Sequence, residues 1–229
     1  MKKLLAIFLL AGTAASCGNR ISEESYEVFN LIRQSDGPTL GYSPTSGVNI
    51  LNVDGYAFKD LNRNGDLDIY EDWRKPARER AADLASQLSI DEIAGLMLYS
   101  SHMRVPHENP ANPQECTYNG KPWAESGADT SALSDNQIKA LREDNMRQIL
   151  VTSLASPTAA AKWNNNLQAL AESLPHGIPA NNSSDPRNET RATDEYNAGS
   201  GGKASRWPTP LGLGASFDPE VVRDFGEVV

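Results

Sequence analysis

The sequence contains few cysteines and histidines, and it has fewer basic than acidic residues. Its 229 residues include two cysteines and three histidines, and 21 lysines and arginines stand against 30 aspartates and glutamates, a formal net charge of −9. Two cysteines cannot build a disulfide-rich scaffold. An acidic chain lacks the basic face that a phosphate backbone requires, so we expect no nucleic-acid partner. With 39% hydrophobic and 22% charged residues, the composition is that of a globular protein.

The sequence also has little continuous hydrophobicity, apart from a short run at the N-terminus. Leu4–Ala11 is an eight-residue apolar run that follows two lysines and precedes small residues leading to Cys17. The run is too short to span a bilayer as a helix, and this layout is typical of an export signal, which we place at residues 1–16. It resembles a bacterial lipoprotein signal, which implies that Cys17 is lipidated and anchors the exported chain to the cell envelope, in the periplasm or at the outer membrane. The alternative is a conventional secretory signal with an incidental cysteine.

The segment that follows the signal is polar and contains several glycines and prolines. We predict that residues 17–47 form mostly a tether, with a short helix over Glu23–Arg33. Residues 48–73 form an N-terminal extension, in which Val48–Phe58 alternates loosely and indicates a strand or a hairpin.

From residue 74 onward, helical and strand patterns alternate along the chain. Two capping boxes predict helix starts, apolar residues at helical spacing predict further helices, and a short apolar run predicts a buried strand. The irregular segment 100–133 is more typical of a functional or inserted loop than of a core. The first predicted helix runs from Ala77 to Leu88. The second runs from Ser89 into the apolar stretch Ile93–Tyr99, whose end could be a buried strand.

A further helix is predicted from Ser134 to about Asn145, followed by a strand over Gln148–Thr152. The helix that begins at Ser156 has an apolar stripe of Trp163, Leu167, Leu170, Ala171 and Leu174. A strand-like segment over Gly177–Ala180 and a last helix from Asp218 complete the prediction.

This alternation is typical of parallel α/β architecture. We predict an α/β fold in which residues 74–229 form an incomplete (β/α)₈ TIM barrel, comprising the first few βα units only. A closed barrel needs about 250 residues and eight strands, and the sequence supplies about three. The last apolar helix has no glycine or asparagine cap, so we expect a piece of a longer protein whose missing C-terminal part is its partner.

An acidic turn at residues 60–71 has the pattern of a twelve-residue EF-hand calcium loop. Gly65 occupies the sixth position, where the sharp turn requires a residue without Cβ, and Leu67 is the usual apolar residue at the eighth. The alternative is that Asx turns close the loop without a metal. Any calcium would be structural, and no cofactor is expected for catalysis. The predicted metal ligands are Asp60, Asn62, Asn64, Asp66, Asp68 and Glu71.

Three stretches resemble the N-terminal part of glycoside hydrolase family 3, the β-glucosidase and β-xylosidase family. They begin at Phe58 (FKDLNRNGDLDIYEDW), at Ala161 (AKWNNNLQALAE, running into GIP) and at Trp207 (WPTPLGLGASFDP), and together they cover roughly residues 56–229. The resemblance implies a (β/α)₈ barrel followed by an α/β sandwich domain, and a carbohydrate substrate cleaved with retention by an Asp nucleophile and a general acid. In the family, these two residues lie on a later strand and usually in the second domain. The resemblance therefore implies that no residue of this chain is the nucleophile or the acid, and that the chain alone is inactive.

The resemblance carries one substrate-binding position over to this chain. It implies that Asp185, which follows the strand-like Gly177-Ile178-Pro179, hydrogen-bonds the hydroxyls of the terminal sugar, because a carboxylate can accept from two vicinal hydroxyls. The alternative is a turn or N-cap aspartate. Arg187 could orient Asp185 or contact the substrate, or it could be an exposed loop arginine. The family's usual His-Gly after this aspartate is Pro186-Arg187-Asn188 here, so the sugar is not defined by the resemblance.

Two functions remain open from the sequence. One is the N-terminal fragment of an exported β-glycosidase that removes terminal β-D-glucosyl or similar residues. The other is a non-catalytic, calcium-stabilised surface lipoprotein that binds glycans or a partner. We expect Cys116 to be a free thiol in a loop and the histidines to be loop residues and not metal ligands. Trp73, Trp163 and Trp207 could stack on sugars, but two of them lie in predicted helical or core contexts, where we expect core packing.

Overall fold

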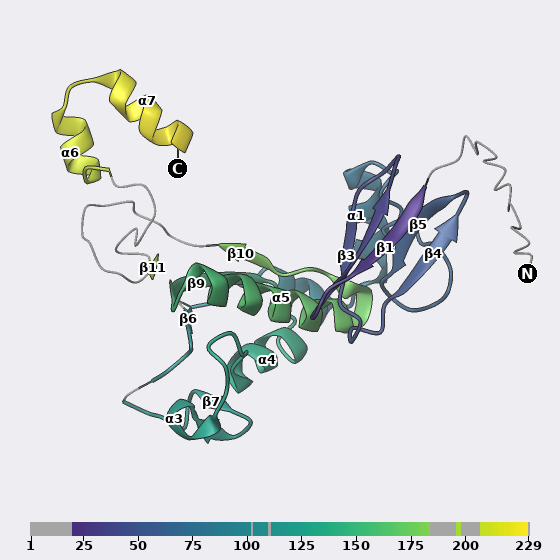
Figure 1. Ribbon diagram of the computed structural model, residues 1–229, viewed down its shortest axis with the longest axis horizontal. Helices are drawn as coiled ribbons and strands as arrows, with labels where there is room; N and C mark the ends of the chain where they lie inside the picture. The colour runs from purple at the N-terminus through teal and green to yellow at the C-terminus, as the bar shows by residue number, and fades with distance from the viewer. Residues whose placement is uncertain (1–19, 102, 110, 184–195, 198–206, 229) are drawn as a thin grey trace, which may run out of the picture.

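The computed structural model describes residues 20–101, 103–109, 111–183, 196–197 and 207–228 (Figure 1). The predicted signal with Cys17, and the predicted sugar-binding residues Asp185 and Arg187, lie outside these ranges. No helix within them is long and apolar enough to cross a membrane.

The N-terminal strands form two small antiparallel sheets, seen at the right of Figure 1. β1 (Ile21–Ser25), β2 (Asn30–Gln34) and β3 (Leu40–Tyr42) make one sheet in the order β1-β2-β3. β4 (Asn49–Val53) and β5 (Tyr56–Asp60) make a two-stranded hairpin.

The prediction of a tether with a helix over Glu23–Arg33 is wrong for the described residues. The segment is a β-hairpin, and the side chains of Arg33 and Glu24 meet across its two strands with an Nε–Oε1 distance of 2.7 Å. The side-chain amide of Gln34 also accepts from the backbone N–H of Ala57 at 3.1 Å, which joins β2 to β5. The segment thus forms strands whose contacts include a partner more than twenty residues away in the chain.

The hairpin prediction for residues 48–58 is confirmed. The turn residues Asp54 and Gly55 have φ of 54° and 80°, and positive φ at both positions is what a tight type I′ hairpin turn requires. Phe58 is fully buried and stacks on Trp73 with ring centroids 5.3 Å apart. The hairpin therefore carries its own small apolar cluster.

Both predicted capping boxes are present. Ser89 caps α2 (Ile90–Leu96) and Ser134 caps α4 (Asp135–Arg142). Each serine side chain accepts from the backbone N–H of the third helical residue, and the side chain of that residue accepts from the backbone N–H of the serine. α1 (Ala77–Gln87) also forms where the apolar spacing predicts it.

The central sheet is mainly parallel and is built around β9 (Gln148–Leu154). β6 (Met103–Val105) pairs with one side of β9 and β10 (Asn181–Ser183) with the other, while β11 (Tyr196–Asn197) pairs antiparallel with the end of β9. Helices lie between these strands along the chain, as the α/β prediction requires. In the described part of the chain the sheet is small and unclosed, so it does not by itself establish a barrel.

The core lies between this sheet and α5 (Pro157–Ser173). The hydroxyl of Ser156 accepts from the N–H of Ala159 at 3.1 Å, and a proline at the first helical position is preorganised for the turn. The predicted apolar stripe is confirmed, since Trp163 and Leu167 are 2% and 0% exposed. The core cluster contains Met103, Val105, Leu141, Ile149, Val151, Trp163, Leu167, Ala171 and Ala180.

Two strand predictions are wrong in position. The end of Ile93–Tyr99 is exposed rather than buried, and only Tyr99 makes a β-bridge, to Gln148. No strand within the described ranges covers its other side. Gly177, where the predicted strand-like segment Gly177–Ala180 starts, is the last residue of the 3₁₀ turn η1 (Pro175–Gly177), and the strand begins only at Asn181.

The segment between β6 and α4 is long and mostly irregular, as predicted. It contains the short strands β7 (Thr117–Tyr118) and β8 (Lys121–Pro122) and the single turn α3 (Trp123–Ser126). We call residues 106–133 the excursion. The strand β6, which has three residues, was not predicted from the sequence.

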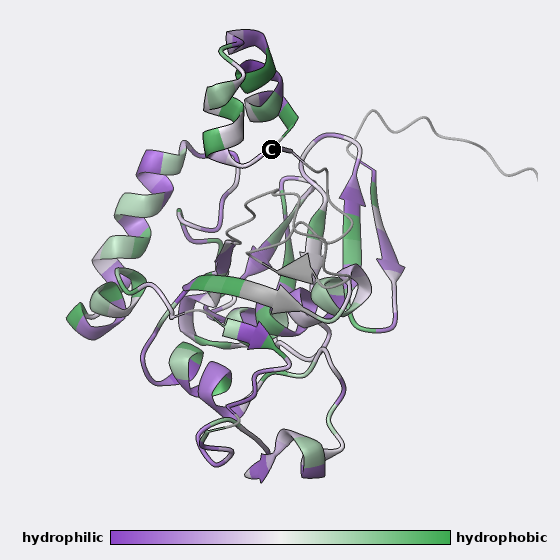
Figure 2. Cartoon of the chain, turned by 90° about the vertical axis from the view of Figure 1, so that its left-hand side faces the viewer, coloured by the Kyte–Doolittle hydropathy of each residue, from purple (hydrophilic) through white to green (hydrophobic). Residues whose placement is uncertain are grey.

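Two helices follow in the C-terminal part, α6 (Pro210–Ala215) and α7 (Pro219–Val228). The predicted cap is confirmed, because the carboxylate of Asp218 accepts from the N–H of Glu220 at 3.0 Å. Beside the label C in Figure 2, these helices carry both hydrophobic and hydrophilic residues.

We expect Leu167→Ala to lower the free energy of unfolding by about 2–5 kcal/mol, because the leucine is fully buried and its removal leaves a cavity. Leu211→Ala is the matched control, since Leu211 is 84% exposed, and it should change the value by less than about 0.5 kcal/mol. Denaturant unfolding measures both. Equal effects would contradict the placement of the core.

Candidate functional site

The carboxyl ends of β6, β9 and β10 lie at one edge of the sheet because these strands are parallel. In parallel α/β folds, ligands bind in the loops at this edge. β6 leads into the excursion, and β10 ends at Ser183, two positions before Asp185 in the sequence. Asp185 therefore follows a strand that ends at this edge, although the residue itself lies outside the described ranges.

The excursion is fastened to the start of α4 by Asp135. Its carboxylate accepts from the hydroxyl of Thr117 at 2.6 Å and from the N–H groups of Asn119 and Gly120 at 3.0 and 2.8 Å. The hydrogen bond from the Thr117 hydroxyl contributes most to lowering the pKa of Asp135 below its ordinary value. The two backbone donors also lower this pKa, whereas burial acts to raise it. The excursion thus has an ordered attachment beside the carboxyl edge.

A buried cysteine and a partly buried histidine lie together inside the excursion. The Sγ of Cys116 is 3.4 Å from the Nε2 of His107, and Cys116 is a free thiol that is only 3% exposed. Burial raises the pKa of Cys116 and lowers the pKa of His107. Both shifts favour the neutral forms, so this pair does not form an activated thiolate nucleophile. The prediction of a free thiol is confirmed.

The acidic loop between β5 and α1 has a fully buried first residue. Asp60 is 0% exposed, and its Oδ2 accepts from the N–H of Gly65 at 3.1 Å. Its Oδ1 has no hydrogen-bond partner among the described residues. Two Asx turns follow, in which Asn62 Oδ1 accepts from Asn64 N at 3.1 Å and Asn64 Oδ1 accepts from Asp66 N at 2.8 Å.

The last residue of this loop closes it from the other end. Glu71 is 4% exposed and accepts from the backbone N–H groups of Leu61, Asn62 and Asp68 at 2.6, 3.3 and 3.1 Å. Burial raises the pKa of Glu71, although these donors favour its charged form. Across the described part of the chain, no three His, Cys, Asp or Glu side chains converge as a metal site. The loop is thus closed here by its own hydrogen bonds, and metal binding stays a prediction.

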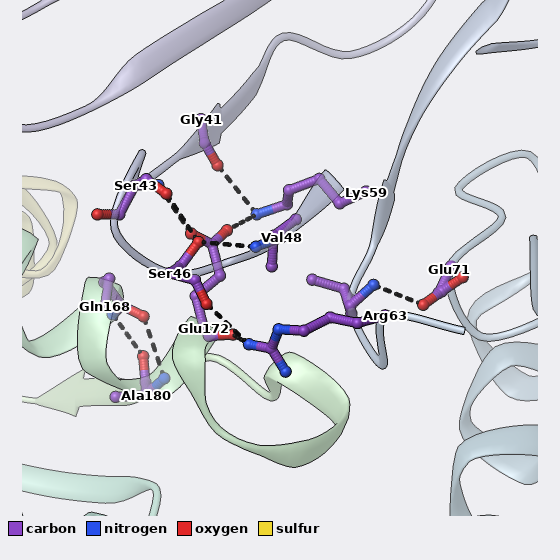
Figure 3. A network of polar contacts seen from close by, with 11 residues as sticks. Gly41, Ser43, Ser46, Val48, Lys59, Arg63, Glu71, Gln168, Glu172 and Ala180 are labelled. Atoms are coloured by element: carbon purple, nitrogen blue, oxygen red, sulfur yellow. Dashed lines mark hydrogen bonds and ion pairs between the residues drawn. The ribbon is translucent and has the colours of Figure 1, made fainter. Parts of the chain in front are cut away.

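A polar network that the sequence analysis missed joins the N-terminal strands to α5 (Figure 3). Glu172, in the last turn of α5, accepts from Lys59 Nζ and from the N–H of Ser43, both at 2.8 Å. Arg63 Nη2 donates to the carbonyl oxygens of Ser46 and Glu172, each at 2.9 Å. The only sequence signal for this contact is a charged residue beside the apolar stripe of α5.

A cavity of about 590 Å³ lies beside this network. It lies at the amino edge of the sheet, because α5 starts after the carboxyl end of β9 and returns to the beginning of β10. It is therefore on the opposite side from the strand ends that would form an active site. Its lining includes Phe29, Tyr42, Lys59, Arg80, Gln168 and Glu172.

The tryptophans of the described residues pack against other side chains. Trp163 is buried and its Nε1 donates to Gln137 at 3.3 Å, and Trp207 meets Phe225 edge to face with centroids 5.6 Å apart.

Among the histidines, His176 has its Nε2 3.7 Å from Oε1 of Glu92. His102 lies outside the described ranges.

No family model matches the chain. The chain is nevertheless similar over most of its length to proteins named as β-glucosidases. It is 38% identical over 188 residues to a periplasmic beta-glucosidase/beta-xylosidase of Dickeya chrysanthemi, which covers 81% of this chain and 26% of the relative. It is 32% identical to the probable beta-glucosidase C of Aspergillus oryzae over 76% of this chain and 24% of the relative. It is 29% identical to the beta-glucosidase C of Emericella nidulans, over 74% of this chain and 24% of the relative. The chain thus spans about a quarter of the length of these relatives.

We expect Glu172→Ala to lower the free energy of unfolding by about 1–3 kcal/mol, because it removes the acceptor of the Ser43 N–H and one of the acceptors of Lys59. Glu143→Ala is the control. Glu143 pairs with Lys139 in an exposed ion pair, so its loss should cost less than about 0.5 kcal/mol. Chemical unfolding of the two variants decides this, and a Glu172 effect no larger than the control would show that the network is not stabilising.

Proposed function

We propose that the chain is the N-terminal part of an exported glycoside hydrolase of the family 3 type. Its complete form would hydrolyse terminal, non-reducing β-D-glucosyl or similar residues with retention. The observation that carries this proposal is the 38% identity, over 81% of the chain, with a protein named periplasmic beta-glucosidase/beta-xylosidase. A non-catalytic binding role is disfavoured because the relatives carry enzyme names.

The parallel strands support a barrel as the framework of this enzyme. β6, β9 and β10 would be its first three strands, joined by crossovers through α4 and α5. A retaining site needs two carboxyl groups about 5–5.5 Å apart, one as nucleophile and one as acid and then base. On this proposal, both come from the part of the relatives' length that this chain does not span.

The contribution of this chain to the active site would be substrate binding. We assign Asp185 to the hydroxyls of the terminal sugar, where a carboxylate can accept two charge-assisted hydrogen bonds. Arg187 would orient Asp185 or contact the substrate. The excursion, attached through Asp135, would form a wall of the same site, since it also follows a strand at the carboxyl edge.

The test is hydrolysis of aryl β-glucosides and aryl β-xylosides by two proteins. One is the 229-residue chain, and the other is the product of the reading frame continued beyond Val229. We expect turnover from the longer protein alone, with the β-anomer released first. Turnover by the 229-residue chain would contradict the assignment of both catalytic carboxyls to the missing part, and an inactive, folded longer protein would contradict the activity.

In the longer protein, we expect Asp185→Asn to lower kcat/KM by about 10²–10⁴-fold, because it weakens hydrogen bonds to two hydroxyls of the substrate. Glu143→Gln, an equivalent change at an exposed residue of this chain, should leave kcat/KM unchanged. Steady-state kinetics on the same aryl glycoside compares them, and equal values for the two variants would remove Asp185 from the site.

We also propose that Cys17 is the lipidated residue, in keeping with the word periplasmic in the name of one relative. Expressed in a bacterium fed labelled palmitate, the wild type should incorporate label and fractionate with membranes. Cys17→Ser should do neither, while Cys116→Ser should behave as the wild type. Equal labelling of all three would contradict the anchor.

A further inference from the structure

We propose that residues 60–71 bind one calcium ion that fixes the junction of β5, α1 and α5. The first observation is the state of Asp60. The residue is 0% exposed, its Oδ2 accepts from Gly65 N inside the loop, and its Oδ1 has no partner among the described residues. Buried carboxylate oxygens are almost always paired with a donor or a cation, because leaving the charge unpaired in the interior is costly.

The other oxygens of the loop surround the same turn. Gly65, in the sixth position, has φ of 86°, which lets the chain reverse there without a Cβ clash. The Oδ2 of Asp68 accepts from the side-chain amides of Asn62 and Asn64 at 2.6 and 2.8 Å. The ligands of the third, fifth and ninth positions are thus already in contact with one another around the turn that Asp60 faces.

Calcium binding requires a defined change from the hydrogen-bonded arrangement. The oxygens of Glu71 accept from the N–H groups of Leu61, Asn62 and Asp68 and would turn to the ion as a bidentate ligand. The side-chain amides of Asn62 and Asn64 now donate through their nitrogens to Asp68. On binding calcium, they would give up these bonds and turn their oxygens to the ion. This explains why three carboxylates do not yet converge in the described part of the chain.

The donor set selects calcium among the common cations. It offers carboxylates, amide oxygens and the backbone carbonyl of Asp66, and it contains no histidine or cysteine. Zinc prefers nitrogen and sulfur ligands, whereas calcium accepts six to eight oxygens in irregular geometry. Magnesium needs near-ideal octahedral coordination at shorter distances and gives up its water reluctantly.

The loop is linked to three elements, so filling it would stabilise more than the loop itself. Its first residue ends β5, and the carbonyl of Tyr70 accepts from Arg80 of α1 at 2.9 Å. Arg63, inside the loop, donates to the carbonyl of Glu172 at the end of α5. Calcium should therefore raise the thermal midpoint, by the linkage between ligand binding and folding. This inference does not depend on the glycosidase proposal.

The experiment is calcium titration calorimetry on the chelator-treated 229-residue chain, with thermal melts in calcium, magnesium and chelator. We expect one site per chain and a midpoint that rises more with calcium than with magnesium. Glu71→Gln should weaken calcium binding by at least ~10–100-fold. Glu79→Gln, the same change at an exposed position of α1, should bind as the wild type.

Asp60→Asn keeps the experiment decisive if Glu71→Gln does not fold. It retains an acceptor for Gly65 N and removes a buried charge whose Oδ1 has no partner among the described residues. In chelator, its midpoint should equal or exceed that of the wild type, and its calcium response should be lost. Absence of calcium binding by the wild type, or unchanged binding by both loop variants, would overturn the proposal.

Discussion

The parallel pairing of β9 with strands on both of its sides is the constraint on which the rest of the structure depends. Parallel neighbours cannot be joined by a tight turn, so the chain needs long crossovers, and α4 and α5 provide them. α5 covers the strand with Trp163 and Leu167, which lie in the same core cluster as Ile149. The last turn of α5 in turn holds the N-terminal strands through Glu172, Lys59 and Arg63. The acidic loop is joined to the same helix, because Arg63 lies in the loop and donates to the carbonyl of Glu172.

The same pairing leaves the sheet open at its edges. Within the described ranges, no strand pairs with the far side of β10. Met97 and Leu98, which directly precede the bridge from Tyr99 to β9, are 82% and 47% exposed. Parallel sheets are normally covered on both faces, and open strand edges attract further pairing. We interpret the open edges as places for further strands of the proposed barrel, in keeping with relatives about four times as long as the matched region.

Local signals made part of this structure predictable. Capping boxes at Ser89 and Ser134 act over four residues, so they form whatever the rest of the chain does. The hairpin over Glu23–Arg33 was predicted as a helix because its support comes from β5, far away in the sequence. Glu172 was missed for the same reason, since its partners precede it by more than a hundred residues. The acidic loop was recognisable because its Asx turns are local. The contact of Arg63 with α5 and the Oδ1 of Asp60, which has no partner among the described residues, appear only in the three-dimensional structure.

Hydrogen–deuterium exchange at β10 tests the central claim, that this sheet is the beginning of a larger one. The N–H of Asn181 donates to Arg147 at 2.7 Å, and backbone groups alternate between the two sides of a strand, so the N–H of Asn182 faces the open edge. The account predicts rapid exchange at Asn182 in the 229-residue chain and strong protection in the protein extended beyond Val229. Equal exchange in the two proteins would contradict the claim that another strand pairs there.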